Sequence, residues 1–185
     1  DERRNAVWVA NSGGFGVDST IVGIGVSDEK VFTSINVGYN PAAFSLTPNG
    51  DIWVLAKGKF NSTTMVGTNG QLGIISLPLN SVKYPDVNFI FLSNGVDGLV
   101  ADSDGNLYFN DNLSGKIKIV KNGSNQIDDF ANGIYYNLAI SPTGEIWATN
   151  AKDFSSPGEV DVFKKDGTKR ATFKTGIIPG GIVFK

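Results

Sequence analysis

The sequence predicts an all-β fold, a β-propeller of four-stranded antiparallel blades, chiefly from a short segment that recurs along the chain. The copies, each a tight turn followed by a β-prone stretch, are residues 49–54, 104–109 and 143–148, with 7–10 as a copy that lacks the turn. Their aromatic residues Trp8, Trp53, Tyr108 and Trp147 lie 45, 55 and 39 residues apart. This period suits a four-stranded blade better than a helical or leucine-rich repeat, so we expect about four blades in this chain.

The second blade shows the pattern most clearly. Its predicted strands, from the innermost outward, are 42–47, 51–56, 71–77 and 88–92. The Pro48-Asn49-Gly50 turn joins the first two strands, because Asn-Gly supplies the positive φ angles that a tight hairpin needs. Apolar and polar residues alternate poorly in the inner strands, as expected where a blade packed between two neighbours buries both of its faces.

The third and fourth blades repeat this order. The predicted strands of the third are 97–101, 106–110, 115–120 and 126–130, and those of the fourth are 136–141, 145–149, 158–163 and 170–175. Their outer hairpins close with Lys121-Asn122-Gly123 and Lys165-Asp166-Gly167, which are strong turn sequences.

The two ends of the chain are irregular. Residues 7–37 supply three strands of a first blade without its inner strand, whereas 180–184 has the pattern of an inner strand with nothing after it. The predicted blade units of this single or partial propeller domain are about 7–40, 41–95, 96–134 and 135–178, with a final inner strand at 179–185. Two interpretations remain open: a closed four-bladed ring that shares one blade between its ends, or the last blades of a longer propeller.

Composition excludes several classes of function. Hydrophobic residues make up 41% of the chain and charged residues 18%, which is typical of an ordered globular protein. With 16 Lys and Arg against 18 Asp and Glu and no basic block, nucleic acid and anionic membrane surfaces are poor partners. No apolar stretch is long enough for a membrane span, and the start lacks the apolar core of a signal peptide, so the protein is expected to be intracellular or to have lost a leader.

The chain contains neither cysteine nor histidine. Disulfides, thiolate nucleophiles, Cys/His zinc sites and a Ser-His-Asp triad are therefore impossible. The segment 102–106 has oxygen ligands at alternating positions, as a calcium loop would, but Leu113 stands where the bidentate Glu belongs, so a plain turn is expected. We predict a noncatalytic protein without a metal or cofactor.

Strand order predicts where a ligand would bind. The longer connections, between the second and third strands and from one blade to the next, lie on one face, and the tight turns lie on the other. A phenylalanine follows the aromatic residue of the repeat by seven residues three times. The candidate ligand-binding residues on the long-loop face are Phe15, Tyr39, Lys57, Phe60, Asp111, Tyr135, Tyr136, Lys152, Asp153 and Phe154. Such a set suits a flat or amphipathic ligand, for example a sugar or a tetrapyrrole.

Each of these residues also has a structural interpretation. The three phenylalanines can pack their loops against the next blade, and the lysines can be solvated surface charges. Asp111 and Asp153 fall in adjacent blades on the same face and could converge as the two carboxylates of a glycan hydrolase or lyase.

Several segments carry a family resemblance: residues 7–16, 37–41, 146–154 and the closing 176–185. With them, the chain resembles the C-terminal half of the YncE-like, YVTN-type β-propeller proteins of Bacteroidetes cell envelopes. The resemblance implies a seven- or eight-bladed ring with N-terminal blades missing here. It also implies an exported protein, periplasmic or a lipoprotein of the outer-membrane surface, whose leader is absent from this chain. Some similar surface propellers capture vitamin B12-type corrinoids for a TonB-dependent transporter.

Three functions follow as hypotheses. The first is a noncatalytic envelope propeller that binds a small molecule, a glycan or a partner protein on its long-loop face, with a corrinoid as the most concrete ligand. The second is a structural or adhesion scaffold that self-associates through open blade flanks, since soluble monomers rarely leave such apolar faces exposed. The third is a carboxylate-dependent hydrolase or lyase acting on glycans.

Overall fold

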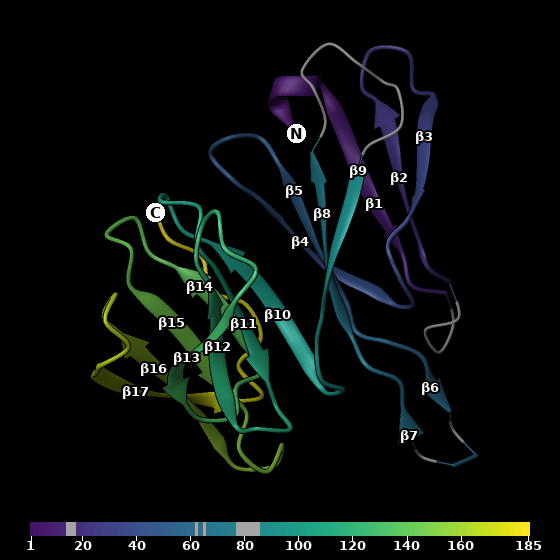
Figure 1. Ribbon diagram of the computed structural model, residues 1–185. Coiled ribbons are helices and arrows are strands. Elements are labelled where there is room, and N and C mark those ends of the chain that lie inside the picture. The colour runs from purple at the N-terminus through teal and green to yellow at the C-terminus, as the bar shows by residue number, and fades with distance from the viewer. Residues whose placement is uncertain (14–17, 62, 65, 77–85) are drawn as a thin grey trace. The chain divides into compact units, whose positions relative to one another are not determined.

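The computed structural model describes residues 1–13, 18–61, 63–64, 66–76 and 86–185 (Figure 1). Seventeen strands and one short 3-10 helix, η1 (Glu2–Arg4), make up the regular structure of these residues. They confirm the predicted all-β fold of antiparallel blades. None of the helical structure in this part of the chain is long and apolar enough to cross a membrane.

Contacts divide the chain into two compact units, Asp1–Gly95 and Val96–Lys185. The first unit holds a three-stranded sheet of β1 (Ala6–Asn11), β2 (Thr20–Gly25) and β3 (Val31–Asn36). Its four-stranded sheet consists of β4 (Pro41–Leu46), β5 (Ile52–Ala56), β8 (Gln71–Ser76) and β9 (Asp86–Phe91). A small ribbon of β6 (Phe60–Asn61) and β7 (Val66–Gly67), which the sequence did not predict, extends the connection between β5 and β8.

The second unit holds two four-stranded sheets. One contains β10 (Val96–Ala101), β11 (Leu107–Asp111), β12 (Lys116–Val120) and β13 (Ile127–Asn132). The other contains β14 (Asn137–Ile140), β15 (Ile146–Asn150), β16 (Pro157–Phe163) and β17 (Lys169–Ile177). Every pair of neighbouring strands is antiparallel and sequential, which is the meander that a propeller blade requires.

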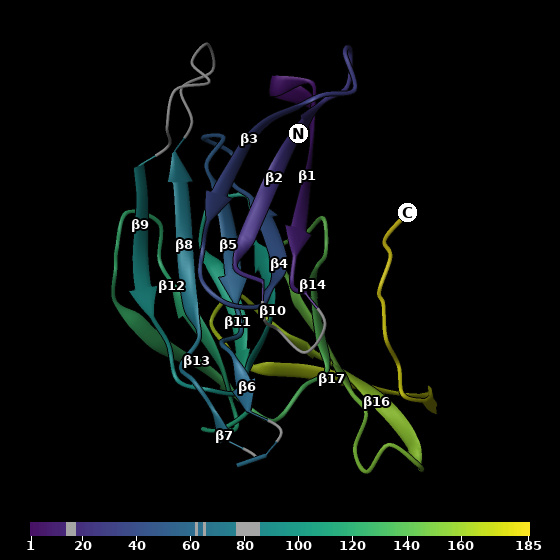
Figure 2. The ribbon, with the colours of Figure 1, turned by 90° about the vertical axis from the view of Figure 1, so that its right-hand side faces the viewer.

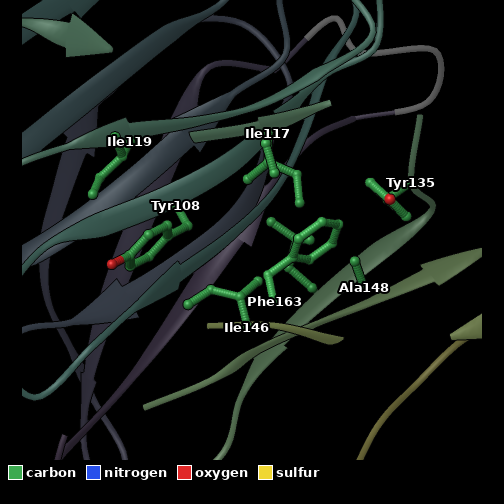
Figure 3. Packing of buried hydrophobic residues seen from close by; sticks show 9 residues of the cluster. Tyr108, Ile117, Ile119, Tyr135, Ile146, Ala148 and Phe163 are labelled. Carbon is green, nitrogen blue, oxygen red and sulfur yellow. The ribbon is translucent and has the colours of Figure 1, made fainter. Parts of the chain in front are cut away.

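Each unit has its own apolar core between its two sheets. In the first unit the core joins residues of β2 and β3 to residues of β5 and β8, including Ile21, Ile52 and Ile75. In the second unit, Figure 3 shows the side chains that form the core: Tyr108, Ile117, Ile119, Ala131, Tyr135, Leu138, Ile146, Ala148 and Phe163. The inner strand β5 is buried throughout, so both of its faces are covered and it carries apolar residues without alternation.

The turn between the first two strands of a blade is built the same way three times. Gly50, Gly105 and Gly144 have φ angles of 92°, 83° and 82°, a left-handed conformation that glycine adopts without strain. The residue before each turn is buried and uses its side-chain oxygen to hold the turn. In the third blade this residue is Asp102, which accepts hydrogen bonds from the backbone N–H groups of Asp104 and Asn106 at 2.9 Å.

The third blade also explains why tyrosine replaces tryptophan in the repeat. The Tyr108 hydroxyl donates to Asp102 Oδ2 at 3.0 Å, inside the core. Burial, together with this neighbouring carboxylate, raises the pKa of Tyr108 above its ordinary value. Asp102 is therefore occupied by its own turn and by Tyr108, which agrees with the prediction of a plain turn at 102–106.

The predicted inner strand at 179–185 is absent. After β17 the chain continues as an extended segment that belongs to no sheet (Figure 2). It lies against the fourth blade instead: Asn137 Nδ2 donates to the Gly180 carbonyl at 3.0 Å, and Phe184 meets the Trp147 ring edge-on at 5.6 Å. A strand needs a neighbouring edge to pair its backbone groups, and residue pattern alone does not supply one.

Candidate ligand-binding site

A hollow of about 400 Å³ opens among the loops of the second unit. Three segments line it: the connection after β11, the link from β13 to β14, and the loop after β15. The lining residues are Asn112, Ile134, Tyr135, Tyr136, Asn150, Ala151, Lys152 and Phe154. They are connections between second and third strands and between blades, the kind on which a ligand site was predicted, although those after β11 (112–115) and β13 (133–136) are short. The volume lies within the range of about 300–1,000 Å³ typical of small-molecule sites.

An aromatic corner forms one side of the hollow. The rings of Tyr136 and Phe154 meet edge to face, with centroids 5.9 Å apart and planes at 84°. Both side chains remain about half exposed, Tyr136 at 48% and Phe154 at 57%, beside the exposed Ile134. Exposed large apolar side chains beside a hollow give a ligand an apolar surface to contact.

The loop that carries Phe154 is held in shape by its own hydrogen bonds. Lys152 and Phe154 have φ angles of 50° and 60°, which non-glycine residues adopt only when their surroundings hold them there. Asp153 Oδ1 accepts from the backbone N–H groups of Ser155 and Ser156 at 3.0 and 2.7 Å, and Oδ2 accepts from the Ser156 hydroxyl at 2.8 Å. These hydrogen bonds hold the pKa of Asp153 well below its usual value.

The polar side chains that line the hollow are those of Asn112, Asn150 and Lys152, besides the two tyrosines. Asn112 Oδ1 is buried and has no hydrogen-bond partner among the described residues. Among the described residues that line the hollow, Lys152 alone is charged, and its Nζ is paired with Glu159 Oε1 at 2.8 Å. Asn150 Oδ1 accepts from the Lys152 backbone N–H at 2.8 Å and so fixes the start of the loop.

Tyr135 joins the hollow to the core. Gly133, with φ of 138°, makes room for its ring, because a Cβ at that position would lie 2.5 Å from the ring. The Tyr135 side chain is 3% exposed, and its hydroxyl donates to Asp161 Oδ2 at 2.8 Å. Burial raises the pKa of Tyr135 above its ordinary value, and the hydrogen bond to Asp161 adds to the rise.

Asp161 is buried at 4% exposure and is the hub of this polar cluster. Besides the Tyr135 hydroxyl it accepts from Lys169 Nζ at 2.7 Å and from the Thr172 hydroxyl. Burial raises the pKa of Asp161, but the hydrogen bonds from Lys169, Thr172 and Tyr135 together outweigh it and leave the pKa below its usual value. The cluster fixes the base of the hollow through Tyr135.

Of the ten candidate residues, the hollow brings together Tyr135, Tyr136, Lys152 and Phe154. The two carboxylates of the hydrolase hypothesis do not line it. Asp111 is buried and accepts from the Ser114 N–H at 3.2 Å, and Asp153 holds the turn of its own loop.

The remaining candidates belong to the first unit. Tyr39 is exposed, and Lys59 Nζ lies 5.6 Å from the centre of its ring. The Lys57 N–H donates to the Asn40 carbonyl at 2.9 Å, which ties this connection to the start of its blade. Phe15 and the side chain of Phe60 lie outside the described residues, so the predicted threefold phenylalanine repeat is represented in the structure by Phe154 alone.

The sequence reasoning missed half of the lining: Asn112, Ile134, Asn150 and Ala151. Asn112 directly follows Asp111 in the shortest of these loops, which contains no aromatic residue. A second amide, Asn110, is 1% exposed, and both its side-chain nitrogen and its oxygen lack partners among the described residues. Nothing in the residue pattern distinguishes these asparagines from the many others in turns.

The sheets define the chain as a β-propeller protein, and comparison with solved structures agrees. No protein-family model and no curated protein matches the sequence. The chain is similar to hydrazine synthase from Kuenenia stuttgartiensis, with a TM-score of 0.72 and 15% identity over 93% of this chain. It is also similar to virginiamycin B lyase from Staphylococcus aureus, with a TM-score of 0.65 and 14% identity over 95% of this chain.

A third similar structure is an auxiliary nutrient binding protein from Bacteroides ovatus, with a TM-score of 0.62 and 13% identity over 96% of this chain. The chain spans 46%, 53% and 41%, respectively, of these three structures. Propellers with such different names share this fold, so the likeness establishes the architecture, and function has to be argued from the site.

Proposed function

We propose that this protein is a noncatalytic β-propeller that binds a small molecule or glycan in the hollow beside Tyr136 and Phe154. The observation that carries the proposal is the half-exposed aromatic corner of Tyr136 and Phe154 beside a hollow of about 400 Å³ that polar side chains also line. Apolar surface with a few convergent polar groups is the usual composition of a ligand site.

The arrangement of the carboxylates favours binding over hydrolysis. A glycosidase of the usual kind needs one carboxyl group with a raised pKa as its general acid. Asp153 has a lowered pKa and three hydrogen bonds within its own loop. Asp111 is buried and bonded to Ser114. Neither carboxylate faces the hollow as a free group, so the site supports recognition without a chemical step.

The proposed setting is the cell envelope, with the protein acting in nutrient capture. A structure of similar fold is described as an auxiliary nutrient binding protein of a Bacteroides species, and the sequence resembles the YncE-like envelope propellers. A corrinoid is one concrete ligand. Because a hollow of about 400 Å³ is near the lower end of the usual range, a corrinoid would rest partly outside it.

Two binding assays on the full chain test the proposal. Cyanocobalamin is added while its visible absorbance is followed, and the labelled protein is applied to a glycan array. We expect binding in one of the two assays and its loss in Tyr136→Ala. The control is Asn125→Ala, because Asn125 is exposed in the connection between β12 and β13 and does not line the hollow. Flat responses in both assays from protein with an intact β-sheet circular dichroism spectrum would refute the proposal.

A second candidate function, a scaffold that assembles with other chains, is favoured by exposed apolar residues around β17. Phe173, Ile177, Ile178 and Val183 are all exposed. Light scattering distinguishes the two functions: a concentration-dependent mass above 19.7 kDa that falls in Phe173→Ser would support assembly. A strictly monomeric particle at all concentrations would contradict it.

A further inference from the structure

We propose that residues 180–184 of one copy complete the first sheet of a second copy by pairing with the open edge of β1. This inference rests on the second candidate function, assembly with other chains, and names the partner and the surfaces that join. It does not depend on a ligand in the hollow. Three observations carry it: a sheet that lacks an inner strand, a segment that belongs to no sheet, and the place where that segment lies.

The first sheet is one strand short within the described part of the chain. Its order is β1-β2-β3, whereas the main sheet of each other blade has four strands. The Asn5 carbonyl accepts from the Val26 N–H on the β2 side at 2.9 Å. The alternation of an antiparallel strand therefore turns the backbone groups of Trp8 and Ala10 toward the open edge. Such an edge is a template for another strand.

The segment after β17 has no strand to pair with. Residues 178–185 are extended and lie outside every sheet. Among the described residues, their backbone forms no hydrogen bond with another backbone group. None of the eight residues is buried, and Val183 is 88% exposed. The chain thus carries an unpaired segment and an unpaired strand edge together.

The segment lies where the inner strand of a following blade would lie. Asn137, at the start of β14, donates to the Gly180 carbonyl at 3.0 Å, and Phe184 meets the Trp147 ring edge-on at 5.6 Å. A similar contact joins the two sheets of the second unit, where Ile140 of β14 packs in the same core cluster as Tyr108 of β11. The fourth sheet therefore holds the segment in place for a further strand to join it.

The complete blades fix the register of the proposed pairing. The residue opposite the aromatic residue of the repeat is, in the order of the blades, Ser45, Val100 and Ala139. A large apolar residue precedes it each time: Phe44, Leu99 and Leu138. Ile182 followed by Val183 matches this pattern, so Val183 falls opposite Trp8 and Ile182 falls opposite Val9.

This pairing would cover apolar surface that each copy exposes. Val7 and Val9 share one face of β1 and are 51% and 37% exposed. Residues opposite each other in a sheet share a face, so Ile182 would lie beside Val9 and Phe184 beside Val7. On the fourth sheet, Phe173 stacks on Trp147 and is 47% exposed. Burial of such surface favours association.

A second copy is the partner that fits, because every chain carries both halves of the junction. The chain spans 46% of the hydrazine synthase structure and 53% of the virginiamycin B lyase structure, so two copies have about the length of one such protein. Exchange of an identical element between copies is a low-cost route to a dimer. We therefore expect a reciprocal dimer, in which each copy gives its segment and receives that of its partner.

Disulfide trapping tests the pairing, and the absence of cysteine from the chain makes it selective. Equal amounts of Val9→Cys and Ile182→Cys proteins are mixed and oxidised with glutathione, so a mixed disulfide joins two copies. The control replaces Val9→Cys with Val31→Cys, because Val31 is exposed in β3, two strands away from β1. Intact mass should show at least about fivefold more mixed disulfide for the first pair, since only opposite residues come within bridging distance.

A proline variant tests the pairing without cysteine. In the proposed register the Val183 N–H donates to the Trp8 carbonyl, and Val183→Pro removes this donor. Because Val183 is exposed and lies in no strand, each chain should still fold, which circular dichroism checks. We expect light scattering to give twice 19.7 kDa for the natural chain. The dimer Kd should rise about tenfold in Val183→Pro and change less than about twofold in Lys185→Pro, outside the paired residues.

The outcomes separate this inference from assembly in general. Equal mixed disulfide in both pairings, or an unchanged dimer Kd in Val183→Pro, would overturn it. A disulfide within a monomeric chain that carries both Val9→Cys and Ile182→Cys would also overturn it, because the pairing would then lie within one copy. If a mass above 19.7 kDa falls in Phe173→Ser but not in Val183→Pro, assembly stands and strand exchange falls. A monomer at all concentrations refutes both.

Discussion

The hydrogen bond between Tyr135 and Asp161 leads to a quantitative prediction for Tyr135→Phe. The substitution keeps the buried ring, which packs edge-on against Phe163 at 5.8 Å, and removes only the hydroxyl that donates to Asp161 at 2.8 Å. A hydrogen bond to a charged group contributes about 1.5–3 kcal/mol to stability. Because Lys169 and Thr172 still donate to the carboxylate, we expect the lower end, a loss of about 1.5 kcal/mol.

Urea unfolding followed by tryptophan fluorescence measures this loss, and thermal unfolding should show Tm lower by about 3–6 °C for a chain of this length. The matched control is Tyr136→Phe, because the Tyr136 hydroxyl has no partner among the described residues and its ring is half exposed. We expect the control to stay within about 0.5 kcal/mol of the natural protein. If Tyr135→Phe also leaves the free energy of unfolding within about 0.5 kcal/mol, the buried cluster does not stabilise the fold as argued.

Three further predictions concern the blade turns and the buried carboxylate. Gly144→Ala should cost about 1 kcal/mol, because a φ of 82° strains a residue that has a Cβ, whereas Gly180→Ala has open space around the new Cβ and should be neutral. Equal unfolding midpoints would contradict this. Asp102→Ala should destabilise by about 1–3 kcal/mol in urea, since the buried Tyr108 hydroxyl and the backbone N–H groups of the turn lose their acceptor. An unchanged midpoint would count against that role. The pKa of Asp161 is lower in the folded protein than in the unfolded chain, so its ionised carboxylate stabilises the fold at pH values above the unfolded pKa of about 3.9. This contribution is lost as the pH falls through the folded pKa. The fall in Tm between pH 5 and pH 3 should therefore be smaller in Asp161→Asn, and an identical fall would refute the assignment.

Local chemistry made the blades predictable. The turn sequences around Gly50, Gly105 and Gly144 require positive φ, and each occurs where the structure has a tight hairpin. Strand boundaries could be set to within a few residues for the same reason. The β6–β7 ribbon and the lack of strand pairing at 178–185 were not predicted, because pairing depends on which edge lies within reach and not on the residues of the strand alone.

The site was predictable only in part. Aromatic residues at a fixed offset from the repeat led to Phe154, and the loop aromatics led to Tyr136. Asn112 could not be distinguished in advance, because an asparagine in a loop usually bonds to its own backbone or to water. Its place in the lining depends on which separate loops meet at the hollow.

The sequence by itself determined most of the blade strands and the repeat: a tight turn, a β-prone stretch and an aromatic residue, recurring at blade intervals. It also excluded the chemistry of cysteine and histidine. Only the tertiary structure decided what the loops do, because it brought Tyr136, Phe154 and Asn112 to one hollow and left Asp111 and Asp153 bonded within their own loops. Turns and strands depend on neighbours along the chain, whereas a binding site depends on which separate loops meet and on what they leave exposed or unpaired.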